Sequence, residues 1–151
     1  MKADVSVAER LAQAGIDAAP SAAMRETCER LLIDIVGLCA GARAEPYIAA
    51  MLGAADADGP CTAIGHVRGF SAADAALING TAAHGEDFDD TFEGGPVHAG
   101  AVVVPAVLAA AERFGLAGTD ALRGIAAGSE ATCRLSTVVP KAVHTAGLHP
   151  T

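Results

Sequence analysis

The chain has 151 residues, the size of one ordinary domain, and carries a net charge of −8. It is 52% hydrophobic but only 3% aromatic. The acidic balance, without a basic stripe, argues against nucleic-acid binding. No apolar run reaches the roughly 18 residues that cross a membrane, and the first residues lack a signal-peptide core. We therefore expect a cytoplasmic protein without a membrane partner.

Small apolar residues dominate the composition, with 17 glycines and no tryptophan. This favours closely packed helices over a β-sandwich, which would need more aromatic and β-branched residues. The apolar content is high enough that part of the surface should contact more protein, either a partner subunit or a further part of the chain. The four cysteines show no C-x-x-C spacing, so we expect buried, reduced thiols.

The first part of the chain predicts three helices. A short one covers Val7–Ala14 and ends at Gly15. Ser21 is a suitable N-cap for a longer helix that reaches about Ala40, and a third spans about Glu45–Ala55. In the long helix, apolar residues at steps of three and four predict one buried stripe: Met24, Cys28, Leu31, Leu32, Ile35, Leu38 and Cys39.

The middle of the chain contains the only weak strand candidate, Cys61–Val67. Ser71 and Asp74 then form a capping-box pattern that opens a helix ending near Gly85. We expect three of its residues to share one inward face: Leu77, Gly80 and His84.

Two more helices are predicted in the last third. One runs from His98 or Ala99 to Phe114, with Pro105 in its first turns or at a kink. The other is capped by Thr119 and reaches about Leu135, after which the chain should be irregular. Glycines at 124 and 128 indicate tight packing. The first of these helices should bury Val103, Val107 and Phe114.

The acidic segment between those central helices is the most unusual feature. Residues 86–93 hold five carboxylates in eight positions, flanked by His84 and His98. No Lys or Arg occurs between Arg68 and Arg113, and carboxylates held close together cannot all ionise at their ordinary pKa. A bound cation, a shared proton or a solvated loop capping a helix N-terminus would each explain the segment.

One cation model is specific. Asp89, Asp90 and Glu93 have the D-D-x-x-E spacing of a Mg²⁺ clamp, although the following Gly-Gly-Pro breaks any helix there. His98 stands at the start of a helix, where the helix dipole favours neutral imidazole while nearby carboxylates favour the charged form. Opposed influences of this kind are typical of an acid or base that works near neutral pH.

Four segments together resemble the MmgE/PrpD family. They are N-G-T-A-A-H at 79–84, D-F-D-D-T at 87–91, H-A-G-A-V-V-V-P-A at 98–106, and G-L-H-P-T at 147–151. The resemblance covers nearly the whole chain but only about the first third of a typical member. It implies an all-α fold, in which residues 1–151 form an incomplete N-terminal portion of the large helical domain, without the α/β lid domain.

The resemblance also implies a function. Members include 2-methylcitrate dehydratase and cis-aconitate decarboxylase, lyases that act on small di- and tricarboxylates, need no iron–sulfur cluster and are usually homodimers. We therefore expect no metal and no other cofactor. By motif, Asp87, His98 and His149 would be catalytic and Thr91 would bind the substrate.

The residues between Thr91 and His98 depart from the better-known members, so the resemblance does not identify the substrate. The basic residues that a polycarboxylate needs lie later in the family's sequence. A second hypothesis is therefore a catalytically silent helical fragment, which serves dimerisation or forms one half of a split enzyme.

Overall fold

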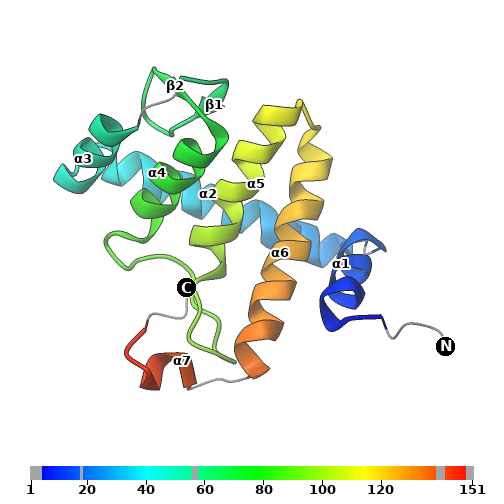
Figure 1. The fold of residues 1–151 in the computed structure, drawn as a ribbon. Coiled ribbons are helices and arrows are strands. Elements are labelled where there is room, and N and C mark those ends of the chain that lie inside the picture. Colours follow the sequence, from blue (N-terminus) through cyan, green and yellow to red (C-terminus); the bar gives the residue numbers. More distant parts are fainter. Residues whose placement is uncertain (1–4, 18, 56–57, 139–141, 149–151) are drawn as a thin grey trace.

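The computed structural model describes residues 5–17, 19–55, 58–138 and 142–148. Within them the fold is helical apart from one short hairpin, which confirms the all-α prediction (Figure 1). The elements are α1 (Val7–Asp17), α2 (Ala22–Ala42), α3 (Pro46–Ala54), β1 (Cys61–Thr62), β2 (Gly69–Phe70), α4 (Ala72–His84), α5 (Ala99–Phe114), α6 (Gly118–Val138) and α7 (Ala142–Thr145). The two strands pair antiparallel, with Cys61 opposite Phe70.

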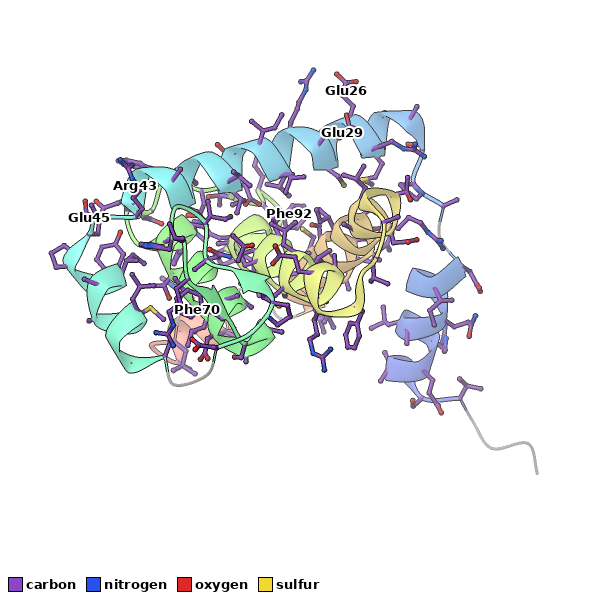
Figure 2. The ribbon with its side chains drawn as sticks, turned by 90° about the horizontal axis from the view of Figure 1, so that it is seen from above. Glu26, Glu29, Arg43, Glu45, Phe70 and Phe92 are labelled. Carbon is purple, nitrogen blue, oxygen red and sulfur yellow. The ribbon has the colours of Figure 1, made fainter. Side chains whose placement is uncertain are left out.

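Helices α4, α5 and α6 form the centre of the fold, and each runs antiparallel to the next: down, up and down in the view of Figure 1. Helix α2 crosses all three on one side, as the view from above shows (Figure 2). The hairpin lies at the end where α4 begins, whereas the acidic loop of residues 85–98 joins α4 to α5 at the opposite end (Figure 1). The loop is therefore held between two packed helix ends.

The predicted helix starts are largely confirmed by their caps. The Ser21 hydroxyl accepts a hydrogen bond from the Met24 N–H at 3.2 Å. The Ser71 hydroxyl accepts from the Asp74 N–H at 3.1 Å and donates to the Asp74 carboxylate at 2.8 Å. Each cap satisfies a backbone donor that has no partner inside its helix.

The stripe predicted for α2 faces the core. Cys28, Ile35 and Cys39 are buried, and the three leucines of the stripe pack partly buried against the same core. Met24, in the first turn, is 40% exposed because the stripe runs beyond the packed region there. Glu26 and Glu29 lie on the opposite, solvent side of the helix (Figure 2).

Glycines allow the central helices to approach closely. A Cβ atom at Gly80 would lie 3.1 Å from the Ala101 carbonyl oxygen. Pro105, four residues after Ala101, has no N–H to donate to that carbonyl. Between α5 and α6, a Cβ at Gly128 would lie 2.7 Å from Cγ1 of Val103. The tight packing predicted from these glycines is therefore confirmed.

Two predicted core residues are on the surface. Leu77 is 61% exposed because α4 turns a different face inward: Ala75, Ile78, Asn79, Ala82 and Ala83. Phe114 is 71% exposed at the last position of α5, and the guanidinium of Arg113 lies over its ring. For α4, helical spacing alone allowed either face to be buried. Its contacts with α2 and α5 determine which face points inward.

Several predicted boundaries were also wrong. Helix α1 continues past Gly15 to Asp17, and α6 continues past Leu135 to Val138. Thr119 lies inside α6, which begins at Gly118, so Thr119 is not the N-cap. The segment after α6, predicted to be irregular, contains the short helix α7.

The cysteines are free thiols, and three of the four are buried, as expected. Burial raises the pKa of Cys39 to about 11, and its thiol donates to the Asn79 carbonyl oxygen at 3.2 Å. In the part of the chain that the structure describes, no single helix combines the length and apolar content needed to cross a membrane; α2 and α3 do so only as a pair bent by 92°.

Candidate active site

The acidic loop places one buried carboxylate between two histidines. The Asp89 side chain is fully buried, and Nδ1 of His84, at the end of α4, lies 3.0 Å from its Oδ1 and 3.2 Å from its Oδ2. Nδ1 of His98, at the start of α5, lies 3.4 Å from the same Oδ1. An ionised carboxylate can only accept hydrogen bonds, so Asp89 favours imidazoles that carry a proton on Nδ1.

The two imidazoles also touch each other. Their ring centroids are 4.8 Å apart and their planes are inclined by 60°, an edge-to-face contact. His98 is the less accessible ring, with 13% of its side chain exposed against 33% for His84. Asp89 therefore orients a pair of imidazoles rather than one.

Asp87 lies on the open side of this group. Its Oδ1 is 3.9 Å from Nε2 of His98, and 78% of its side chain is exposed. Its backbone has φ +57°, the left-handed region, and no other non-glycine residue within the described ranges has a positive φ. Such a conformation costs of the order of 1 kcal/mol and is enriched at functional sites. The two nitrogens of His98 thus face two different carboxylates, Asp89 inside and Asp87 outside.

Asp90 points away from the histidines and caps α5. Its Oδ1 and Oδ2 accept from the Gly100 N–H at 2.9 and 3.2 Å. Burial raises the pKa of Asp90, and the Asp89 charge raises it further, while the Gly100 hydrogen bond and His98 act in the opposite direction. His98 occupies the N-cap position of α5 without a capping hydrogen bond from its own side chain. Asp90 therefore provides the cap and leaves the His98 ring facing the carboxylates.

Short contacts fix both ends of the loop. The Tyr47 hydroxyl, on α3, donates to Oε1 of Glu86 at 3.1 Å. At the other end, the Phe92 N–H donates to the Val97 carbonyl at 3.0 Å, which closes the Gly-Gly-Pro segment into a turn. The loop therefore presents Asp87 and Asp89 from a constrained backbone.

The structure brings two predicted catalytic residues together, Asp87 and His98. Thr91, the predicted substrate-binding residue, is exposed on the same loop. His149 lies outside the described residues. His84, at the end of α4, contacts Asp89.

The sequence did not distinguish Asp89 from Asp90 and Glu93, with which it shared the interpretations of a cation clamp and of a solvated loop that caps a helix, so the central position of Asp89 was not predicted. Asp87 and Asp89 face His98, while Asp90 faces Gly100.

Because Asp89 and Asp90 point in different directions, the structure argues against the Mg²⁺ clamp of Asp89, Asp90 and Glu93. The group whose ligand atoms could converge on one ion is instead His84, Asp87, Asp89 and His98, whose atoms lie within 4.8 Å of one another. Two imidazoles and two carboxylates can orient and exchange protons, or bind a cation.

A separate hollow of about 630 Å³ lies between α1 and α6 and is lined mainly by apolar side chains, among them Leu11 and Met24. None of the four residues of the His–Asp group lines it. This hollow is therefore separate from the His–Asp group of the α4–α5 loop.

Comparison with known families identifies the fold. Residues 5–151 match the model of the MmgE/PrpD N-terminal domain. The chain belongs to the MmgE/PrpD family. This is a family of dehydratases and decarboxylases. In this MmgE/PrpD domain the His–Asp group lies at the loop between α4 and α5, which contains the D-F-D-D-T segment.

Proposed function

We propose that this MmgE/PrpD domain forms the acid–base wall of a lyase active site for small di- and tricarboxylates. The reaction is dehydration of a 2-methylcitrate-like hydroxy acid or decarboxylation of a cis-aconitate-like acid. The observation that carries the proposal is His98, held between buried Asp89 at Nδ1 and exposed Asp87 at Nε2.

The geometry supplies the two proton-transfer groups that dehydration needs. One group removes a weakly acidic C–H proton and another protonates the departing hydroxyl. Asp89 holds the proton of His98 on Nδ1, which leaves Nε2 directed to the open side beside Asp87. We assign Asp87 and His98 as this pair, with His84 and Asp89 as positioning residues. Decarboxylation would use the same pair to deliver a proton to the carbanion-like carbon.

A polycarboxylate also needs positive charge near its binding site. Within this chain, protonated His98 and His149 would supply part of it, and Thr91 would donate a hydrogen bond to a carboxylate or hydroxyl. Residues 69–112 contain no Lys or Arg, and we propose that other protein contributes the remaining cationic side chains. This requirement agrees with an active site that is shared with a lid domain.

Substitutions in the natural gene product test this assignment. Asp87→Asn and His98→Gln should each lower kcat by about 10²–10⁴ on the preferred tricarboxylate, the usual contribution of one acid or base. Glu93→Gln is the matched control, because it removes an exposed carboxylate from the same loop. Undiminished turnover in Asp87→Asn would remove Asp87 from the mechanism.

We further propose that residues 1–151 are an incomplete portion of the helical domain and that the protein works as a homodimer. Large apolar side chains remain exposed on several helices, including Ile33 on α2 and Val138 on α6. Exposed apolar surface of this kind is typical of protein interfaces. Sedimentation velocity should therefore find the 151-residue chain self-associated, and a compact monomer would contradict this proposal.

A further inference from the structure

We propose that His84, Asp89 and His98, completed by Asp87, form a binding site for one divalent transition-metal ion of the zinc class. This inference goes beyond the proposed lyase function and does not depend on it. It rests on the donor atoms, their spacing, the rigidity of their supports and the local charge.

The spacing of the donor atoms fits a tetrahedral ion. Zinc bonds to imidazole nitrogen and carboxylate oxygen are about 2.0–2.2 Å long, so neighbouring ligand atoms in a tetrahedron lie roughly 3.3–3.5 Å apart. Oδ1 of Asp89 is 3.0 Å from Nδ1 of His84 and 3.4 Å from Nδ1 of His98. Small side-chain rotations would therefore let one ion replace the proton-mediated contacts among these three residues.

The fourth donor is accessible. The Asp87 side chain is 78% exposed, and one of its carboxylate oxygens lies within 4.8 Å of a ligand atom of each of the other three residues. An exposed carboxylate on the open side gives the ion a path from solvent and can move inward to close the coordination shell. The three inner donors, in contrast, are in place before the ion arrives.

Rigid elements hold those inner donors. His84 ends α4, His98 precedes the first turn of α5, and the Asp90 cap joins the loop to α5. A preorganised site binds its ion more tightly, because fewer side-chain rotations are lost on binding.

Charge and donor type define the class of ion. Two carboxylates with no Lys or Arg in residues 69–112 leave a local negative charge that a divalent cation would balance. Two imidazoles favour zinc, cobalt or nickel, whereas Mg²⁺ and Ca²⁺ prefer oxygen ligands and their hydration waters. The ion would bind Asp87 and His98, the residues assigned above to proton transfer, together with the positioning residues His84 and Asp89, so its binding should inhibit rather than support catalysis.

Cobalt titration of the 151-residue chain tests the proposal directly. Co²⁺ should bind with a stoichiometry of one per chain and produce the strong visible absorption of a tetrahedral ion. Zn²⁺ should then displace it and bleach the band. Millimolar Mg²⁺ should leave the band unchanged.

Variants locate the site. His84→Gln and His98→Gln should each weaken Co²⁺ binding by about tenfold or more, since loss of even an outer-shell partner costs about 10–100-fold in affinity. His66→Gln and His144→Gln are matched controls outside the group and should retain the wild-type band. Circular dichroism establishes that each variant is folded.

Two results would overturn the proposal: no Co²⁺ or Zn²⁺ binding at about 1 mM, or a band that survives in the folded His84→Gln/His98→Gln double variant. A titration band that depends on His66 or His144 would also overturn it. None of these results bears on the lyase proposal, which is judged by turnover without added metal.

Discussion

Asp90 in the acidic loop accepts a hydrogen bond from the backbone N–H of Gly100, two residues after His98, at 2.9 Å. This contact joins the loop to the first turn of α5 and supplies the cap that His98 does not provide. Because His98 lies in the segment between these two residues, the cap also restrains the backbone that carries its imidazole beside Asp89.

Substitutions at Asp90 distinguish the stability contributed by its capping hydrogen bond from that contributed by its charge. Asp90→Ala should lower the free energy of unfolding by about 0.5–2 kcal/mol, the usual loss on removing a cap. Asp90→Asn keeps an oxygen acceptor for the Gly100 N–H and should cost less. Urea unfolding at neutral pH measures both, and equal losses would mean that the hydrogen bond contributes nothing.

The raised pKa of Asp90 predicts a pH dependence with a definite sign. The folded state holds this proton more tightly than the unfolded chain, whose carboxyl titrates near 3.8. The stability of wild type relative to Asp90→Asn should therefore be greatest below that value and decline as pH rises through the folded pKa. Paired unfolding curves across the acid range check this, and a difference that grows with pH would contradict the burial argument.

Gly100 should tolerate no side chain. A Cβ there would lie 2.7 Å from Cδ1 of Leu31 and would overlap the Asp90 carboxylate. Gly100→Ala should therefore destabilise the fold by about 1–3 kcal/mol despite the better helix propensity of alanine. Gly37→Ala is the matched control in α2, where a Cβ meets no atom within 4 Å, and should stabilise by up to about 1 kcal/mol. Thermal unfolding of the two variants should shift in opposite directions.

Asn79 joins α4 to the hairpin. Its side-chain amide donates to the Thr62 carbonyl at 2.8 Å and its oxygen accepts from the Ile64 N–H at 2.8 Å. Asn79→Ala leaves both backbone groups without these partners and should cost about 2–3 kcal/mol in urea unfolding. Gln13→Ala, which removes an exposed amide from α1, should change stability by less than about 0.5 kcal/mol. A similar small loss for Asn79→Ala would show that water replaces both bonds.

Because Asp87 has a positive φ, we expect its backbone to cost stability while its carboxylate serves activity. Asp87→Gly and Asp87→Ala both remove the carboxylate and should both lower kcat by about 10²–10⁴, as for Asp87→Asn. Glycine adopts this backbone without strain, so Asp87→Gly should be about 0.5–1 kcal/mol more stable than Asp87→Ala. Chemical denaturation compares the two, and an equally stable pair would mean that the loop relaxes when the side chain is lost.

Local sequence signals were enough to predict most helices. Ser21 and Ser71 are caps whose partners lie three residues away, and the stripe of α2 follows from helical spacing alone. Such features depend on short-range geometry, which the order of residues determines directly. The family resemblance likewise came from contiguous motifs and is confirmed over residues 5–151.

Tertiary contacts decided which face of α4 is buried, so Leu77 is exposed where its helical spacing predicted an inward face. Tertiary contacts also decided which of the five carboxylates enter the interior and which bind elsewhere. Asp89 enters the interior because two imidazoles from different helices meet there, and Asp90 turns to Gly100 because α5 begins beside it. By itself, the sequence determined that charge and histidine would concentrate between two helices. Only the packing of α4 against α5 decided which carboxylate is buried, because burial depends on partners brought close in space.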